Sequence, residues 1–225
     1  ARRPSLPGVK VFADPVALLR SGLVDAVLIA TPHPTHAPLA LAALKAGFHV
    51  LLEKPFAVHK AEALQVAAAA KRRPRQIFGL VFNQRTDPYF RKIRELIRGG
   101  TFGPVRRIHW TITNWFRPEA YYQSSSWRAT WAGEGGGVLL NQCPHNLDLL
   151  QWMTGMPVCV RAHCHFGRYH DIEVEDDVSA YLEYADGAHA TFIASTGEAP
   201  GTNRLEIALD GGRIVYEHDV LQLTR

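Results

Sequence analysis

The chain has 225 residues, of which 47% are hydrophobic and 20% charged, a balance typical of a globular protein with a buried core. No uninterrupted apolar stretch approaches the roughly 20 residues that cross a bilayer, and the N-terminus lacks the apolar core of a signal peptide, so we predict a soluble, cytoplasmic protein. The net charge is +4, and the basic residues are dispersed apart from Lys71–Arg75, which we interpret as a solvated helix end, so we expect no nucleic-acid partner. Three irregularly spaced cysteines indicate free thiols.

The first part of the chain, from Val9 to Phe82, alternates short apolar runs with stretches of good helix formers, as parallel βαβ units do. Asp14 and Pro15 are suited to begin a helix, and Gly47 is suited to end one. We therefore expect a parallel sheet with crossover helices. The predicted strands are 9–12, 25–30, 48–52 and 76–82, and the predicted helices are 15–20, 36–46 and 60–71.

After Asn83 the pattern changes to segments in which apolar and polar residues alternate, as in strands with one covered face. This favours a second, α+β domain, and we place the two domains at residues 1–84 and 85–225. The expected helices are 87–98 and one long helix within 137–153, and the expected strands are 105–113, 158–166, 177–184, 188–193, 205–209 and 213–216.

The tripeptide Glu53-Lys54-Pro55 directly follows the predicted strand at 48–52. It places an amine at the carboxyl end of a parallel strand, where open α/β sheets bind ligands. A lysine there acts as an acid or base on a substrate hydroxyl when partial burial or a nearby cation lowers its pKa. The alternative is a solvated lysine in a strand-to-helix turn, the more common situation of a lysine.

The segment Ala30–His36 occupies the equivalent place after the preceding strand, and its prolines hold an extended turn that a flat ligand can approach. His33 and His36 could ligate a metal, but no third ligand is evident, and zinc sites need three or four. His163-Cys164-His165 also resembles a metal-binding pattern. On a strand, however, its histidines and its cysteine point to opposite faces, so we expect no metal.

A third candidate segment runs from Trp127 through three glycines, Gly135–Gly137, which allow close backbone approach to a ligand. Its aromatic residues offer stacking faces. The helical part that follows contains Asn141, His145 and Asp148.

One continuous helix from Val138 places Asn141, His145 and Asp148 on one face, whereas Pro144 either kinks that helix or begins a new one. In both arrangements His145 and Asp148 are neighbours. A histidine held by a carboxylate is a plausible proton-handling unit, and a lone core histidine is the alternative.

Together, Ala30-Thr31-Pro32, Glu53-Lys54-Pro55 and the segment Gly135–Asp148 resemble the glucose-fructose oxidoreductase and inositol dehydrogenase family, Gfo/Idh/MocA. The order of domains and elements matches over essentially the whole chain. The resemblance implies an α/β fold class, with a partial Rossmann domain followed by an α+β domain that has a large, mostly antiparallel open sheet. It also implies an NAD- or NADP-dependent dehydrogenase or reductase acting on a sugar, inositol or related polyol, and a homo-oligomer formed through that sheet, without nucleic acid or membrane partners.

By position, the resemblance assigns Lys54 as the catalytic lysine and His145 as the histidine that relays the substrate proton. Asn141 stands where many members have an aspartate. It can hydrogen-bond a hydroxyl but carries no charge, so proton transfer is expected to depend more on Lys54 and His145. The expected cofactor residues are Ala30, Thr31, Pro32, His33, His36, Glu53, Lys54, Pro55, Trp127 and Arg128. The expected substrate residues are Lys54, Asn114, Trp127, Asn141 and His145, with Arg128 and Tyr122 as further positioning groups.

The chain departs from the family pattern because no glycine-rich strand-to-helix turn precedes Val9, and because the family's C-terminal stretch is cut short after Arg225. We therefore expect a chain truncated at both ends. Two alternative functions stay open. One is an enzyme that recycles a tightly bound cofactor internally, and the other is a non-catalytic sugar- or nucleotide-binding regulatory protein on the same scaffold.

Overall fold

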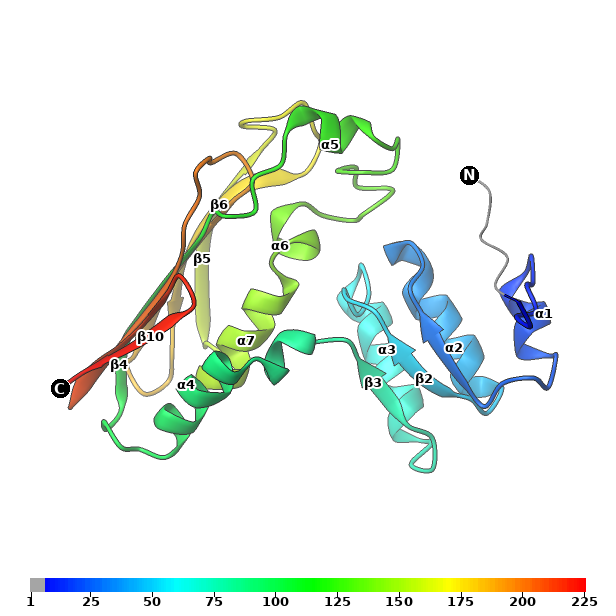
Figure 1. Cartoon of the computed structure of the whole chain (residues 1–225), viewed down its shortest axis with the longest axis horizontal. Coiled ribbons are helices and arrows are strands. Elements are labelled where there is room, and N and C mark those ends of the chain that lie inside the picture. Colours follow the sequence, from blue (N-terminus) through cyan, green and yellow to red (C-terminus); the bar gives the residue numbers. More distant parts are fainter. Residues whose placement is uncertain (1–6) are drawn as a thin grey trace. The chain divides into compact units, whose positions relative to one another are not determined.

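The computed structural model describes residues 7–225. They form two compact units (Figure 1). The first consists of the described residues up to Thr31 together with Thr35–Val81, and the second consists of Pro32–Pro34 and Phe82–Arg225. Between residues 7 and 225, no helix is both long and apolar enough to cross a membrane.

The first unit is a three-stranded parallel sheet in the order β1-β2-β3, with β1 at Ala26–Ile29, β2 at His49–Leu52 and β3 at Phe78–Leu80. Its helices are α1 (Pro15–Leu19), α2 (His36–Lys45) and α3 (Lys60–Lys71). The core consists of small residues from α2 and α3 packed against the strands, which lets these helices lie close to the sheet. Its fully buried members include Ala40, Ala43, Leu44, Val50, Leu52 and Val66.

Local signals explain where these helices begin and end. The Asp14 carboxylate accepts hydrogen bonds from the backbone N–H of Val16 and Ala17, and Pro15 occupies the first turn of α1. After α2 the chain turns at Gly47, whose φ of +98° suits glycine. The predicted helix at 60–71 has the observed bounds of α3.

The predicted strand at 9–12 is wrong, because no strand forms over these described residues, and Val9 and Val11 are 58% and 62% exposed. Alternation alone does not make a strand, since its backbone groups need a neighbouring strand as partner. The strand predicted as buried at 25–30 is covered on one face only. In β1, Ile29 is buried whereas Leu28 is 62% exposed.

The second unit is built on a seven-stranded sheet in the order β10-β9-β8-β4-β7-β6-β5. Strands β4 and β7 pair in parallel and all other neighbours are antiparallel, so the predicted fold class is confirmed. The strands are β4 (Val105–Ile112), β5 (Cys159–Phe166), β6 (Glu175–Glu183), β7 (His189–Ser195), β8 (Asn203–Leu209), β9 (Gly212–Glu217) and β10 (Val220–Thr224). The helices are η2 (Asn83–Thr86), α4 (Pro88–Arg98), α5 (Glu119–Gln123), α6 (Val138–Asn141) and α7 (Pro144–Thr154).

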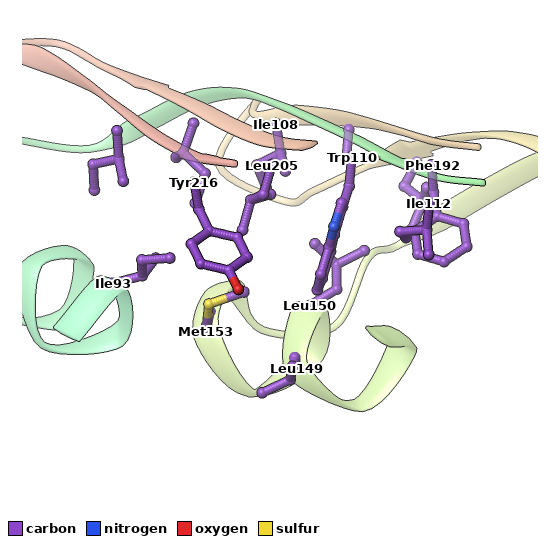
Figure 2. Packing of buried hydrophobic residues seen from close by; sticks show 14 of the residues in the cluster. Ile93, Ile108, Trp110, Ile112, Leu149, Leu150, Met153, Phe192, Leu205 and Tyr216 are labelled. Atoms are coloured by element: carbon purple, nitrogen blue, oxygen red, sulfur yellow. The ribbon is translucent and has the colours of Figure 1, made fainter. Parts of the chain in front are cut away.

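The core of this unit lies between the sheet and the helices α4 and α7 (Figure 2). Ile93 of α4 and Leu149 and Met153 of α7 meet side chains from the central strands, such as Trp110 and Phe192. All five are essentially inaccessible to solvent. This packing fixes α7, and with it the segment that carries the candidate site.

Pro144 begins a new helix, which decides between the two arrangements that the sequence left open. Helix α6 ends at Asn141 and α7 starts at Pro144, whose missing N–H costs nothing in a first turn. The start of α6 is anchored to the sheet, because the carboxylate of the buried residue Glu175 in β6 accepts hydrogen bonds from the backbone N–H of Gly137 and Leu139, at 2.9 and 3.1 Å.

Candidate active site

The candidate residues fall into two groups, one in each unit, and the first group lies at the carboxyl edge of the parallel sheet. Ile29 of β1 and Leu52 of β2 are opposite each other, so the two strands end at the same level. The backbone N–H of Glu53 donates to the carbonyl of Ile29 at 2.9 Å. The turn after β1 and the tripeptide Glu53-Lys54-Pro55 are therefore adjacent, as the sequence predicted.

His36 ties these two turns together. It is the first residue of α2 and is only 1% exposed. Its Nδ1 lies 2.7 Å from the carbonyl oxygen of Pro55, and its Nε2 lies 2.8 Å from that of Thr31. The ring is thus enclosed by backbone, and we propose that His36 shapes a cofactor site by holding the turns.

Lys54 is half-buried, and its backbone N–H donates to the Glu53 carboxylate at 3.1 Å. The peptide bond between Lys54 and Pro55 is cis, and the Pro55 ring is buried. Ala30 and Thr31, which follow β1, are exposed, and so is the next residue, Pro32. The edge of the sheet therefore combines exposed residues after β1 with a half-buried lysine after β2.

In the second unit, Asn141 faces a buried carboxylate. The Asn141 Nδ2 donates to Glu134 Oε1 at 2.6 Å, and Glu134 Oε2 accepts from the backbone N–H of Ala129 at 2.8 Å. Glu134 is only 2% exposed. His145, in the first turn of α7, is half-buried and meets the ring of Phe82 edge-on at 5.8 Å. Glu134 was not among the residues predicted from the sequence, where its one signal was an acidic residue next to three glycines.

Arg128 is clamped by aromatic rings. Its guanidinium lies 4.5 Å from the ring centre of Tyr121 and 4.6 Å from that of Trp127, and it donates to the Tyr121 hydroxyl at 2.9 Å. Such contacts restrict the side chain while leaving a planar donor surface. The Trp127 ring itself is 40% exposed, which leaves it available for stacking on a ligand.

Asp148 holds Arg85. Its two carboxylate oxygens accept from Arg85 Nε at 2.7 Å and from an Arg85 terminal nitrogen at 2.5 Å, and this pairing raises the pKa of Arg85. The Arg85 guanidinium also lies over the rings of Phe82 and Trp152. We therefore assign the Asp148 carboxylate to this ion pair and not to His145.

Replacing Asp148 by asparagine is expected to lower the free energy of unfolding by about 2 kcal/mol, because a nearly buried carboxylate leaves its bidentate partner. Urea denaturation followed by tryptophan fluorescence measures this. The control is Glu95→Gln, which breaks an exposed pair with Lys92 and should cost about 0.5 kcal/mol or less. Equal losses in the two variants would contradict the assigned role of Asp148.

Tyr122, which the sequence suggested as a further positioning group, is buried within the second unit. It is 8% exposed, its hydroxyl donates to Thr196 Oγ1 at 2.9 Å, and its ring packs on His170 at 4.8 Å between ring centres. Burial raises its pKa to about 12. Asn114, by contrast, is exposed and remains a proposed substrate residue.

The raised pKa of Tyr122 makes stability depend on pH. Between about 10 and about 12 the folded chain keeps a proton that the unfolded chain has lost, so the free energy of unfolding falls as pH rises through this window. We expect Tyr122→Phe to reduce that slope in urea titrations, whereas Tyr169→Phe, at a half-exposed ring, should leave it unchanged. The same slope in both variants would be inconsistent with a buried, neutral Tyr122.

The described residues contain no cluster of three or more side chains placed to hold a metal ion. On β5, Cys164 packs toward the core while His163 and His165 are exposed, which confirms that the histidines and the cysteine occupy opposite faces. Burial raises the pKa of the Cys164 thiol.

Comparison with protein families accounts for both units. Residues 90–215 match the GFO/IDH/MocA C-terminal domain, and residues 3–79 match the oxidoreductase family with an NAD-binding Rossmann fold. The chain belongs to the Gfo/Idh/MocA family. The resemblance seen in the sequence is therefore confirmed.

Two curated relatives illustrate this family. The uncharacterized oxidoreductase YdgJ of Escherichia coli strain K12 is 35% identical over 152 residues, which are 68% of this chain and 42% of the relative. An inositol 2-dehydrogenase of Leifsonia xyli is 32% identical over 158 residues, which are 70% of this chain and 43% of the relative. The chain thus spans less than half the length of either relative.

Two solved dehydrogenase structures superpose closely on the chain. The WlbA dehydrogenase of Bordetella pertussis, in complex with NADH and UDP-GlcNAcA, has a TM-score of 0.85 at 27% identity, covering 91% of this chain and 63% of that one. A levoglucosan dehydrogenase in complex with NADH and levoglucosan has a TM-score of 0.83 at 25% identity, and the match covers 94% of this chain and 60% of that one.

Proposed function

We propose that the chain is part of an NAD- or NADP-dependent oxidoreductase that reversibly oxidises a secondary alcohol of a sugar, an inositol or a related polyol. The observation that carries this proposal is Lys54, a half-buried amine at the carboxyl edge of the parallel sheet, beside the exposed turn after β1. That edge is where sheets of this class bind nucleotides. The two solved relatives, in complex with NADH and with UDP-GlcNAcA or levoglucosan, support the same class of reaction.

The edge of the first unit fits a nicotinamide cofactor, because the exposed residue Thr31 and the turn at Glu53-Lys54-Pro55 can border a flat ring. When bound, the nicotinamide supplies the acceptor for the hydride. We propose Ala30, Thr31, Pro32, His33, His36, Glu53, Lys54 and Pro55 as residues that form or shape the cofactor site, and Trp127 and Arg128 as further cofactor-binding residues.

The proposed chemistry assigns each remaining residue a task. The Lys54 amine removes the proton of the substrate hydroxyl, and His145 passes that proton on. The carbinol carbon loses a hydride, so that the C–OH group becomes C=O. Asn141 holds a ring hydroxyl, with Asn114 and Trp127 as further positioning groups, because orientation of the substrate supplies much of a catalytic effect.

The test uses the full-length protein. Inositols, anhydrosugars and nucleotide-linked sugar acids are supplied with NAD or NADP, and the absorbance of the reduced cofactor is followed. We expect at least one polyol to give a rise that depends on enzyme concentration. A polyol that binds by calorimetry without any reduction of cofactor would instead support a non-catalytic binding protein, a reading that Asn141 favours because it carries no charge.

An enzyme that recycles a tightly bound cofactor remains the second catalytic candidate. It predicts that the purified full-length protein contains nucleotide in near-equal molar amount and turns over without added NAD. Acid extraction and chromatography measure the nucleotide. A protein free of nucleotide that needs added NAD excludes this candidate.

We also propose that the chain forms a homo-oligomer through its large sheet. The face opposite α4 and α7 carries half-exposed polar side chains, among them Arg107, His109 and Glu206. Light scattering coupled to size-exclusion chromatography tests this, and a monomer at micromolar concentration would speak against it.

A further inference from the structure

The buried carboxylate of Glu134 lies directly behind Asn141. Along the chain, Glu134 precedes Gly135–Gly137 and the single turn of α6, which ends at Asn141. Both oxygens of the Glu134 carboxylate accept hydrogen bonds. Oε1 accepts from Asn141 Nδ2 at 2.6 Å, and Oε2 accepts from Ala129 N at 2.8 Å. The Arg128 guanidinium lies 3.9 Å from Oε1, which balances the charge in this nearly inaccessible place.

A carboxylate fixes which way the Asn141 amide faces. An ionised carboxylate only accepts hydrogen bonds, so the NH₂ group of Asn141 must point to Glu134 and its Oδ1 must point to the other side. A bond of 2.6 Å to a charged acceptor is short and strong. Without it, a side-chain amide can rotate by half a turn at little cost and present a donor in place of an acceptor.

We propose that Glu134 is a positioning residue that locks the Asn141 amide, so that Oδ1 accepts a hydrogen bond from a substrate hydroxyl. Glu134 also places a negative charge one hydrogen bond behind the substrate-facing group. This inference rests on the proposed function, because it assigns Asn141 to the substrate.

Three variants test the pair. In Glu134→Gln one of the two oxygens that accept from Ala129 N and Asn141 Nδ2 is replaced by an NH₂ group, which can only donate. In Asn141→Asp two carboxylates face each other and must share a proton or repel. The double variant Glu134→Gln/Asn141→Asp restores every hydrogen bond, because the glutamine accepts from Ala129 N and donates to the new aspartate.

In the full-length enzyme we expect Glu134→Gln to lower kcat by about tenfold to a hundredfold, the factor for losing one hydrogen bond to a charged group, while the KM for NAD changes little. The double variant should recover most of kcat. Asn141→Asp alone should be poorly active at neutral pH and regain activity as pH falls, when the carboxylate pair takes up a proton.

Other charged groups near Glu134 are common to all the variants. They include the Arg128 guanidinium, and the titratable ring of His33 has its Nδ1 3.1 Å from the backbone oxygen of Glu134, so the pH profiles are compared with that of the wild type. The control is Glu173→Gln, which removes a carboxylate that accepts from Trp131 N in the same region, and it should leave kcat unchanged.

Melting temperatures separate this inference from the proposed function. If the two residues pair, each single variant melts lower than the wild type and the double variant recovers. If the wild type shows no turnover, the proposed function fails, yet recovery in the melting cycle would still support the pair. Additive losses in melting temperature, or a kcat in Glu134→Gln equal to that of the wild type, would overturn the inference.

Discussion

Replacing Lys54 by alanine is expected to lower the turnover of the full-length enzyme on a verified polyol by about a hundredfold or more, the usual effect of losing a general acid–base group. Lys54 is half-buried at the end of β2, in a turn that His36 holds against the end of β1. The residue is therefore held by its backbone at the edge where the cofactor is proposed to bind. Steady-state kinetics at saturating cofactor measure the loss.

Lys60→Ala is the matched control, because Lys60 is exposed at the start of α3 and removal of a cation there does not disturb the helix N-terminus. We expect its turnover to equal that of the wild type. Cofactor binding by Lys54→Ala, followed by fluorescence, should persist. A Lys54→Ala enzyme with unchanged turnover would remove Lys54 from the mechanism.

Replacing Gly137 by alanine is expected to lower the free energy of unfolding by about 3 kcal/mol, at the upper end of the effects of overpacking. A Cβ at this position would lie 1.9 Å from the backbone oxygen of Glu175, and the backbone of β6 cannot move aside as a flexible side chain can. Any movement of Gly137 away from β6 that relieves this clash would also disturb the hydrogen bond from Gly137 N to the Glu175 carboxylate. Because α6 carries Asn141, we expect activity to fall with stability.

Tryptophan fluorescence during urea denaturation measures this loss, since all five tryptophans lie in the second unit. The control is Gly211→Ala in the same unit, where the nearest backbone atom would be 3.3 Å from the new Cβ. We expect a clearly smaller loss there. Equal losses for the two substitutions would mean that the close approach between Gly137 and β6 does not limit stability.

Elements that depend on local signals were the most predictable from sequence. Asp87 followed by Pro88 begins α4 through hydrogen bonds to the N–H of Tyr89 and Phe90, as a helix cap is expected to do. The alternating segments of the second unit became strands, and the central strands β4 and β7 have one face buried, whereas β5 keeps Val160 and Phe166 57% and 55% exposed, so the covered face predicted there is not observed. The tripeptide Glu53-Lys54-Pro55 could be placed at a sheet edge from the sequence, because the end of the preceding strand is marked by the residues next to it.

Features that depend on distant partners were not predictable. Strand β10 was missed because its connection to β9 contains His218 and Asp219 at positive φ, where glycine or asparagine is the usual signal. The parallel pairing of β4 with β7 joins segments far apart in the chain. The strand expected at 9–12 does not form, because among the described residues its alternating pattern has no neighbouring strand as a hydrogen-bonding partner.

The candidate site shows the same division. The sequence identified Asn141 and His145 as chemical groups, but the hydrogen bond from Asn141 to Glu134 depends on how the glycine segment folds back. Likewise, the sequence suggested Asp148 as a partner for His145, whereas in the fold both oxygens of the Asp148 carboxylate accept hydrogen bonds from Arg85 of η2. Residue types are visible in a sequence, whereas the partners of buried charges are set by packing.

The most direct test of the proposed function is the fate of the hydride. The full-length protein is supplied with a polyol that carries deuterium on its carbinol carbons, and the nicotinamide cofactor, whether added or extracted from the protein, is then analysed by mass spectrometry. We predict that deuterium appears in the reduced cofactor and that Lys54→Ala suppresses this transfer by about a hundredfold. A polyol that binds to the protein and never transfers deuterium to either NAD or NADP would contradict the account.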